Sequence, residues 1–414
     1  MTRHRVFVLG GVAALALMAG LWSSQTRRSD EPPLMQAVVP GLEAGINAIT
    51  EVRIRTAGDA LQATIRRGES GWTVAERGDW PADVDALRTY LLKLAQAKRV
   101  EAKTSSPALY EKLGVESVDA ATAGGVQLEI DGLAQPVKLI VGRNVVRGSG
   151  SYMRYAGDAQ SWQTDTDLAV EKSTANWLRR ELVDIAAGRV TQVEVVPPAG
   201  PKIAIVRAAA GGSGDFSLAN LPKGRELASE YVADATAGFL AGLRFDDVLD
   251  AAGHEEPASG AVHATFATED GIGITVSAWK DGEQARNQFA ATLDEAVAAR
   301  FVEQAQAKAV REHEALKTAT AADPASVPAS GASGPGRDGA PASSAGDSPD
   351  VATKEQAAPL AVTDPAKDRD QRLAALRAEV DSLNARFKGK TFVLPAFKAD
   401  NLHKALESYL KPKA

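Results

Sequence analysis

An unbroken apolar segment near the amino terminus, Val6 to Trp22, imposes the first constraint on this chain of 414 residues. The segment follows Arg3 and Arg5, carries no charged residue and precedes Arg27 and Arg28. Folded as a helix it would span about 25 Å, close to the hydrocarbon thickness of a bilayer. No second apolar run of this length follows it. The sequence therefore predicts one membrane-spanning helix and one large aqueous portion.

Residues 1–28 are predicted to be a retained membrane anchor, with a cleaved signal segment as the alternative. A signal peptide ends in a small-x-small cleavage site, whereas Gly20-Leu21-Trp22 places a large aromatic residue at the natural break. Under the positive-inside rule, Arg3 and Arg5 favour a cytoplasmic amino end. We therefore expect a single-pass protein of the cytoplasmic (inner) membrane whose bulk is periplasmic or otherwise extracytoplasmic.

The composition excludes several classes of site. The chain contains no cysteine, which rules out disulfides, thiolate nucleophiles and cysteine-ligated zinc or iron–sulfur centres. Its net charge is −6, and its basic doublets, such as Arg66-Arg67 and Lys98-Arg99, are typical of solvated faces. No nucleic-acid partner is expected, because such proteins carry an excess of positive charge for the phosphate backbone.

The aqueous portion is predicted to contain one α+β module twice. Residues 49–54 and 190–195 both show the apolar–polar alternation of a half-buried strand. In each copy a second strand, an aromatic strand and a helix follow in that order. In the first copy they are predicted at 63–66, 72–75 and 81–94, and in the second at 204–207, 216–219 and 232–243. This internal repeat predicts two related modules of antiparallel sheet plus helices.

Further elements are expected to complete each copy. The first copy gains strands at 126–130, 137–141 and 152–155 and a helix at 173–188. The second gains a hairpin at 261–266 and 272–278, then a closing strand at 391–394 and a helix at 402–410. The long interval before the closing strand indicates an insertion.

The insertion is predicted to be a helical hairpin. Residues 284–317 and 367–388 are predicted helices, and the second has a coiled-coil seam of Leu373, Leu376, Val380, Leu383 and Phe387. Residues 318–366, rich in Ala, Pro, Ser and Gly, are predicted to be a disordered linker. The predicted boundaries are therefore as follows along the chain. A membrane anchor or signal segment covers 1–28, a linker 29–48 and the first module 49–188. The second module covers 189–283 and, after the insertion at 284–388, ends with a closing strand and helix at 389–414.

The sequence assigns no catalytic, cofactor-binding or metal-ligating residue. The five histidines, at positions 4, 254, 263, 313 and 403, show no ligand spacing. An acidic group offers oxygen atoms of the kind that calcium prefers, but its spacing fits no EF-hand loop and favours a solvated turn. The group consists of Asp246, Asp247, Asp250, Glu255 and Glu256.

Other candidate motifs have structural interpretations. Gly142, Gly148 and Gly150, with Ser149, are expected in a hairpin, and glycines 211–214 lie between predicted strands, so neither segment indicates a phosphate loop. Glu181 and Asp184 would share one helix turn, where neighbouring arginines favour ion pairing over acid–base chemistry. The aromatic residues expected in the core are Trp72, Trp162 and Trp177.

Several segments resemble the bacterial family known as domain of unknown function 4340, across about residues 49–250 with a weaker tail at the carboxyl end. They are Trp72-Thr73-Val74, Pro81-Ala82-Asp83, residues 103–107, Tyr110 to Val115, Ile140-Val141-Gly142, Tyr152-Met153-Arg154 and Trp177 to Ile185. The resemblance implies a single-anchor envelope protein, often encoded near an ABC transporter of the gliding-motility type and its auxiliary subunit.

The resemblance carries no catalytic residues, so it implies a non-enzymatic accessory or scaffold. The implied partners are the membrane, ABC transporter subunits and an auxiliary envelope protein, with no cofactor. Two alternatives stay open, a periplasmic glycan- or lipid-binding module and, less favoured, a hydrolase.

Overall fold

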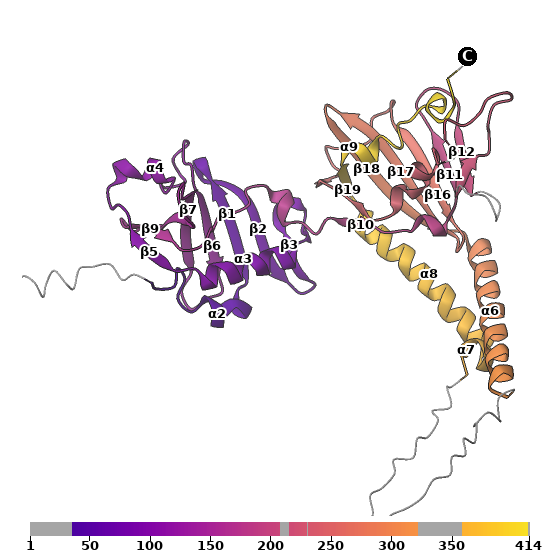
Figure 1. The fold of residues 1–414 in the computed structure, drawn as a ribbon, viewed down its shortest axis with the longest axis horizontal. Coiled ribbons are helices and arrows are strands. Elements are labelled where there is room, and N and C mark those ends of the chain that lie inside the picture. Colours follow the sequence, from indigo (N-terminus) through magenta and orange to yellow (C-terminus); the bar gives the residue numbers. More distant parts are fainter. Residues whose placement is uncertain (1–34, 208–214, 230, 322–357, 413–414) are drawn as a thin grey trace, which may run out of the picture. The chain divides into compact units, whose positions relative to one another are not determined.

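The computed structural model describes residues 35–207, 215–229, 231–321 and 358–412, which form antiparallel sheets and helices (Figure 1). The α+β class predicted from the sequence is confirmed. The predicted membrane helix, at residues 6–22, lies outside the described residues. Among the residues that are described, no helix combines the length and the apolar character needed to cross a bilayer.

The chain divides into two compact units. Unit 1 comprises Met1–Arg180 with Asp247–Leu249, and unit 2 comprises Glu181–Asp246 with Asp250–Ala414. Unit 1 therefore ends before residue 188, the predicted boundary. The difference arises because residues 181–183 form a strand that pairs within unit 2.

A nine-stranded antiparallel sheet forms most of unit 1. Its order is β4 (Trp80–Pro81), β3 (Gly71–Val74), β2 (Ala60–Gly68), β1 (Glu51–Thr56), β6 (Val126–Asp131), β7 (Val137–Asn144), β8 (Ser151–Tyr155), β9 (Ser161–Thr164) and β5 (Arg99–Ala102). Alternate residues such as Val52 and Ile54 are buried, as a sheet with one core face requires.

Helix α3 (Val84–Gln96) supplies much of the remaining core of unit 1. It begins where the Asp83 side chain accepts a hydrogen bond from the Ala86 amide, so its start lies after the predicted Pro81. Its buried residues recur at helical spacing: Leu87, Tyr90, Leu91 and Leu94. Two short helices, α2 (Leu42–Gly45) and α4 (Tyr110–Leu113), complete the unit.

An eight-stranded sheet forms the centre of unit 2, although residues Asp247–Leu249 of its edge strand are grouped with unit 1. Its order is β13 (Phe216–Leu218), β12 (Ile203–Arg207), β11 (Val190–Val196), β16 (Val262–Thr268), β17 (Ile272–Asp281), β18 (Gln284–Leu293), β19 (Lys390–Leu394) and β15 (Asp247–Asp250). A separate pair consists of β10 (Glu181–Val183) and β14 (Leu243–Arg244). The core contains stacked Phe239 and Phe266, with ring centres 5.7 Å apart.

The two sheets share one strand order. Unit 1 has β3-β2-β1-β6-β7-β8-β9-β5, and unit 2 has β13-β12-β11-β16-β17-β18-β19-β15. In both, the first three strands form a meander, and a strand placed early in the chain closes the opposite edge. This shared order is the architecture that an internal repeat predicts.

Three helices predicted by apolar spacing are wrong. Residues 173–188 form a short 3-10 turn (Thr174–Trp177) and then β10, because Leu178 and its neighbours pair with the backbone around Ala82. Residues 232–243 hold only α5 (Asp234–Ala237) and a 3-10 turn. Residues 402–410 hold a 3-10 turn after α9 (Ala396–Ala399), since Leu410 pairs with Leu227.

The insertion in unit 2 begins later than predicted. Residues 284–293 are strand β18 rather than helix, and helix α6 (Glu295–Ala321) follows. Helices α7 (Leu360–Thr363) and α8 (Pro365–Phe387) lead back to the sheet. Of the linker predicted to be disordered, residues 322–357 lie outside the described residues, while its two ends are helical in α6, α7 and the start of α8. Helices α6, α7 and α8 are called the arm below.

Candidate functional site

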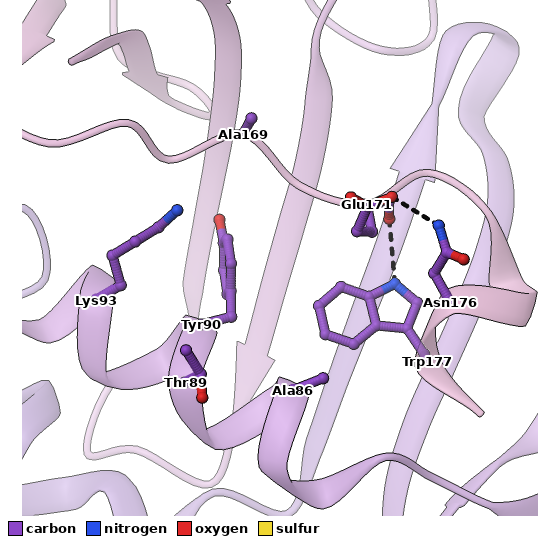
Figure 2. A pocket seen from close by; sticks show the side chains of 8 residues that line it. All are labelled: Ala86, Thr89, Tyr90, Lys93, Ala169, Glu171, Asn176 and Trp177. Atoms are coloured by element: carbon purple, nitrogen blue, oxygen red, sulfur yellow. Dashed lines mark hydrogen bonds between the residues drawn. The ribbon is translucent and has the colours of Figure 1, made fainter. Parts of the chain in front are cut away.

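A shallow groove in unit 1 is the candidate binding site (Figure 2). Helix α3 forms one side, and the segment from Ala169 to Trp177 forms the other. The groove has a volume of about 320 Å³, and its lining residues are Ala86, Thr89, Tyr90, Lys93, Ala169, Glu171, Asn176 and Trp177.

Two aromatic rings form the floor of the groove. Tyr90 and Trp177 meet edge to face, with ring centres 6.2 Å apart and planes at 89°. They are only 8% and 4% exposed, so they offer little ring surface to a ligand. This position agrees with the core role predicted for Trp177.

The polar atoms of the groove are held by internal hydrogen bonds. The Tyr90 hydroxyl donates to the Leu168 carbonyl at 3.1 Å, and the Trp177 indole N–H donates to the Glu171 carbonyl at 3.1 Å. The Asn176 amide donates to the Glu171 carboxylate at 2.7 Å. Figure 2 shows the last two bonds converging on Glu171, which fixes this wall of the groove.

The groove contains a phenol of raised pKa and side chains of both charge signs. Burial, reinforced by the charge of Asp167, raises the pKa of Tyr90, so its phenol stays protonated at physiological pH and cannot act as a base. The Lys93 ammonium lies 5.9 Å from the centre of the Tyr90 ring. Lys93 and Glu171 thus supply one charge of each sign at the rim, which suits a small polar or zwitterionic group.

The acidic group noted in the sequence is dispersed by its own pairings. Asp250 pairs with Lys390 at 2.7 Å, and the Glu255 carboxylate accepts from the Gly253 amide at 3.0 Å. Glu256 pairs with His263 at 3.2 Å. Within the described ranges, no three His, Asp or Glu side chains are grouped so as to hold a metal ion. Asp247 and Asp250 lie on strand β15, whereas Glu255 and Glu256 lie in the loop after it, so the predicted solvated turn describes only part of the group.

The glycine motif of residues 142–150 has a packing role. A Cβ atom on Gly142 would lie 2.3 Å from the Leu113 carbonyl oxygen, and one on Gly150 would lie 1.8 Å from the Thr164 carbonyl oxygen. Gly150 also has φ of +101°. These glycines therefore allow close backbone approaches, while Ser149 is an exposed loop residue. Residues 211–214 lie outside the described residues.

Glu181 and Asp184 do not share a helix turn. Glu181 lies on β10 and pairs with Arg244 at 2.8 Å, and Asp184 accepts from the Gly242 amide at 2.8 Å. Both carboxylates thus make exposed local contacts within unit 2. His403, one of the scattered histidines, has a lowered pKa because of burial and the nearby charge of Lys280.

An ion-pair ladder on the sheet of unit 1 was missed by the sequence analysis. The Arg53 guanidinium contacts Glu129 at 2.9 Å, Asp131 at 2.7 Å and also Glu51. Burial alone would raise the pKa of Glu129, but hydrogen bonds from Gln127 and Arg53 and nearby positive charges lower it. Apolar–polar alternation in the sequence predicted these strands. Which carboxylates lie beside Arg53 depends on the register between β1 and β6, and the sequence does not give that register.

Three of the segments that carry the family resemblance pack against one another. Arg154 donates to the Val115 carbonyl at 2.8 Å, and its guanidinium carbon lies 4.6 Å from the centre of the Tyr110 ring. Tyr110, Val115 and Ile140 form one buried cluster. The shared motifs thus fix helix α4 on the sheet, which is a structural role.

Comparison with known proteins gives one family. Residues 72–327 match the model of a family described as a domain of unknown function, DUF4340. No curated protein and no solved structure matches the chain.

Proposed function

This chain belongs to the DUF4340 family, and we propose that it is a membrane-anchored extracytoplasmic scaffold, a non-enzymatic accessory of an ABC-transporter-type envelope complex. The apolar segment Val6 to Trp22 would hold it in the cytoplasmic membrane. The two sheet units would stand outside the cytoplasm and present surfaces to transporter subunits and to an auxiliary envelope protein.

The observation that carries this proposal is the arm of unit 2. It replaces the β18–β19 connection, whose counterpart in unit 1 is the short β8–β9 turn. Helices α6 and α8 would measure about 40 and 35 Å at 1.5 Å per residue. They extend away from the sheet of unit 2 (Figure 1), and so add surface to that unit without altering its strand order.

The base of the arm is fixed to the sheet. The Asn384 side chain donates to the Ala291 carbonyl and accepts from the Ala291 amide, both at 2.8 Å. Phe387 packs against Phe289, with ring centres 5.4 Å apart. A partner bound to the arm would therefore be held rigidly relative to the sheet of unit 2.

Further along the arm, polar contacts hold the helices together. Gln306 donates to the Pro365 carbonyl at 2.7 Å and to the buried Asp368 carboxylate at 3.0 Å. The outer face of α6 carries exposed Lys308, Arg311 and Glu312. Such a charged, rigid helix face favours a protein partner over a small ligand.

Affinity purification of the full-length chain from crosslinked membranes tests the proposal. Wild type should recover transporter subunits, and a Lys308→Glu, Arg311→Glu variant should recover fewer of them. The matched control is Arg88→Glu, an exposed charge reversal on helix α3 of unit 1. Recovery of no membrane subunit by wild type would contradict the scaffold, and equal recovery by the arm variant would contradict the arm as the contact.

The groove of unit 1 supports a second candidate, a glycan- or lipid-binding module. Its volume lies at the lower end of the range for small-ligand sites. A Lys93→Ala, Glu171→Gln variant would then lose a thermal shift that envelope glycan fragments or phospholipids induce in wild type. No shift with either ligand class would remove this candidate.

A further inference from the structure

The tip of the β7–β8 hairpin, residues 143–150, has an exposed apolar and basic surface. Val146 is 95% exposed, more than any other large hydrophobic side chain in the part of the chain that the structure describes. Arg143 and Arg147 flank it, and both are exposed. Residues 132–157 contain no Asp or Glu, so the whole hairpin is cationic.

The exposure of Val146 belongs to a defined turn rather than to a loose chain end. The Val145 amide donates to the Gly150 carbonyl at 3.0 Å. Gly148 has φ of +120°, and Gly150 approaches the Thr164 carbonyl too closely for any Cβ atom. The turn is therefore specified by these two glycines, and Val146 lies at its outer part.

The strand register places this tip at the end of the sheet where the described chain begins. Asn144 pairs with Ser151, and Thr164, whose hydroxyl bonds to Ser151, pairs with Arg99 of the edge strand β5. The Met35 amide donates to the Arg99 carbonyl at 2.6 Å, and Met35 is 62% exposed. Residues 143–150 and Met35 thus lie at the same end of one sheet.

We propose that the hairpin tip contacts the anionic lipid headgroups of the membrane that anchors the chain. This inference rests on the anchoring in the proposed function. Twelve residues lie between Trp22 and Met35. An extended segment of that length spans at most about 45 Å, so this end of the sheet stays near the bilayer. Arg143 and Arg147 meet lipid phosphates, and Val146 inserts between headgroups.

The contact orients the anchored protein and does not replace the anchor. Each arginine near an anionic surface strengthens binding about fivefold, and a single valine adds little more. Such a contact is weak for a free protein but is occupied when a short tether supplies a local concentration in the millimolar range. Asp165 and Asp167, at the same end of the sheet, limit its strength further.

Site-specific fluorescence on the full-length chain tests the contact. Because the chain contains no cysteine, Ser149→Cys provides a single attachment point for an environment-sensitive probe beside Val146. Ala159→Cys, in the β8–β9 turn at the opposite end of the sheet, is the matched control. The labelled proteins are reconstituted in phosphatidylcholine vesicles with and without phosphatidylglycerol, and quenching by nitroxide-labelled lipid is measured.

The probe at residue 149 should be quenched severalfold more than the probe at residue 159, and more strongly when phosphatidylglycerol is present. Adding Arg147→Glu should reduce the phosphatidylglycerol-dependent contact at least about fivefold, and adding Val146→Asp should abolish it. Equal quenching at residues 149 and 159 in protein that floats with the vesicles would overturn the tip contact and leave the anchor in place. Protein that does not float with vesicles would overturn both proposals.

Discussion

In unit 1, individual charged side chains make several ion pairs and hydrogen bonds that the hydrophobic pattern of the sequence does not predict. Arg53 contacts carboxylates on two strands, and Glu129, only 5% exposed, receives bonds from Arg53 and Gln127. A buried charge of this kind is stable only while its partners remain. Hydrophobic alternation predicts which residues face the core, but it does not predict which polar residues share the other face.

Replacing Glu129 should weaken unit 1 and alter its response to acid. Because the pKa of Glu129 is lower folded than unfolded, its contribution is present above the unfolded pKa, near 4.3, and is lost as pH falls through the folded value. Glu129→Gln should cost about 1–3 kcal/mol at pH 7 and flatten the acid dependence. Urea unfolding from pH 7 to pH 3 measures both effects.

The control for this variant is Glu69→Gln, at an exposed turn position of unit 1. It should leave the free energy of unfolding unchanged within about 0.5 kcal/mol. A Glu129→Gln protein with wild-type stability at pH 7 would mean that the ladder contributes nothing to folding.

Gly150 should tolerate no side chain. A Gly150→Ala substitution combines φ of +101° with a contact of 1.8 Å to the Thr164 carbonyl, so we expect a loss of about 2–4 kcal/mol. Gly148→Ala also has positive φ, but its nearest atom is 3.9 Å away, and it should cost only about 1 kcal/mol. Chemical denaturation measures the free energy of unfolding of both variants, and the difference between them gives the cost of the steric clash at Gly150. Equal losses of stability would argue against a close approach of Gly150 to the Thr164 carbonyl.

At the scale of helices and strands, the sequence predicted strands better than helices. Apolar–polar alternation located most strands of both sheets. Helices α3 and α8 were also predicted, because their apolar residues recur at helical spacing over a long stretch and Asp83 and Asp364 cap their amino ends. The failures were short apolar runs, as at Trp177, where pairing with the chain near Ala82 overrides helical spacing. Strand β18 was misread because it is followed directly by α6, and Asp294 caps that helix by accepting from two amides.

The candidate site was less predictable than the fold. Trp177 was placed in the core correctly, but its neighbour Tyr90 belongs to a helix 87 residues earlier in the chain, so no local pattern joins them. Tertiary packing creates the groove, and the helix predicted for residues 173–188 would have placed Trp177 on a different element. A single sequence carries no signal for such a pair.

The arm should depend on one amide side chain at its base. Asn384→Ala removes both bonds to Ala291 and should cost about 2 kcal/mol, with faster hydrogen exchange in α8. Arg377→Ala removes an exposed pair with Glu295 and should cost less than about 0.5 kcal/mol. Hydrogen-exchange mass spectrometry distinguishes them, and unchanged exchange in α8 of Asn384→Ala would contradict the anchoring role.

At the scale of the whole molecule, the repeated strand order allows the two units to diverge. Unit 2 carries the arm where unit 1 has a short turn, and unit 1 carries the ladder and the groove. Antiparallel neighbours permit this, since an insertion between them changes no pairing. The sequence indicated the repeat, and the boundaries shifted by several residues because β10 pairs within unit 2.

Deleting residues 322–357 and joining the ends with a short Gly/Ser linker should leave the melting temperature within about 2 °C of wild type. Extending the deletion through α7 should lower the stability of unit 2, because it removes Ala361, which is only 2% exposed. Calorimetry of the two deletions measures this. A large loss from the shorter deletion would show that residues 322–357 contribute to the folded structure.

The position of β19 sets the order in which the molecule can be completed during synthesis. Asn287 pairs with Phe392, so the second sheet waits for nearly the last residues to emerge from the ribosome, whereas every strand of the first sheet lies before residue 165. The nascent second sheet therefore carries an open β18 edge for about a hundred residues of translation. A chaperone that shields strand edges would act on this chain late, and on its carboxyl half.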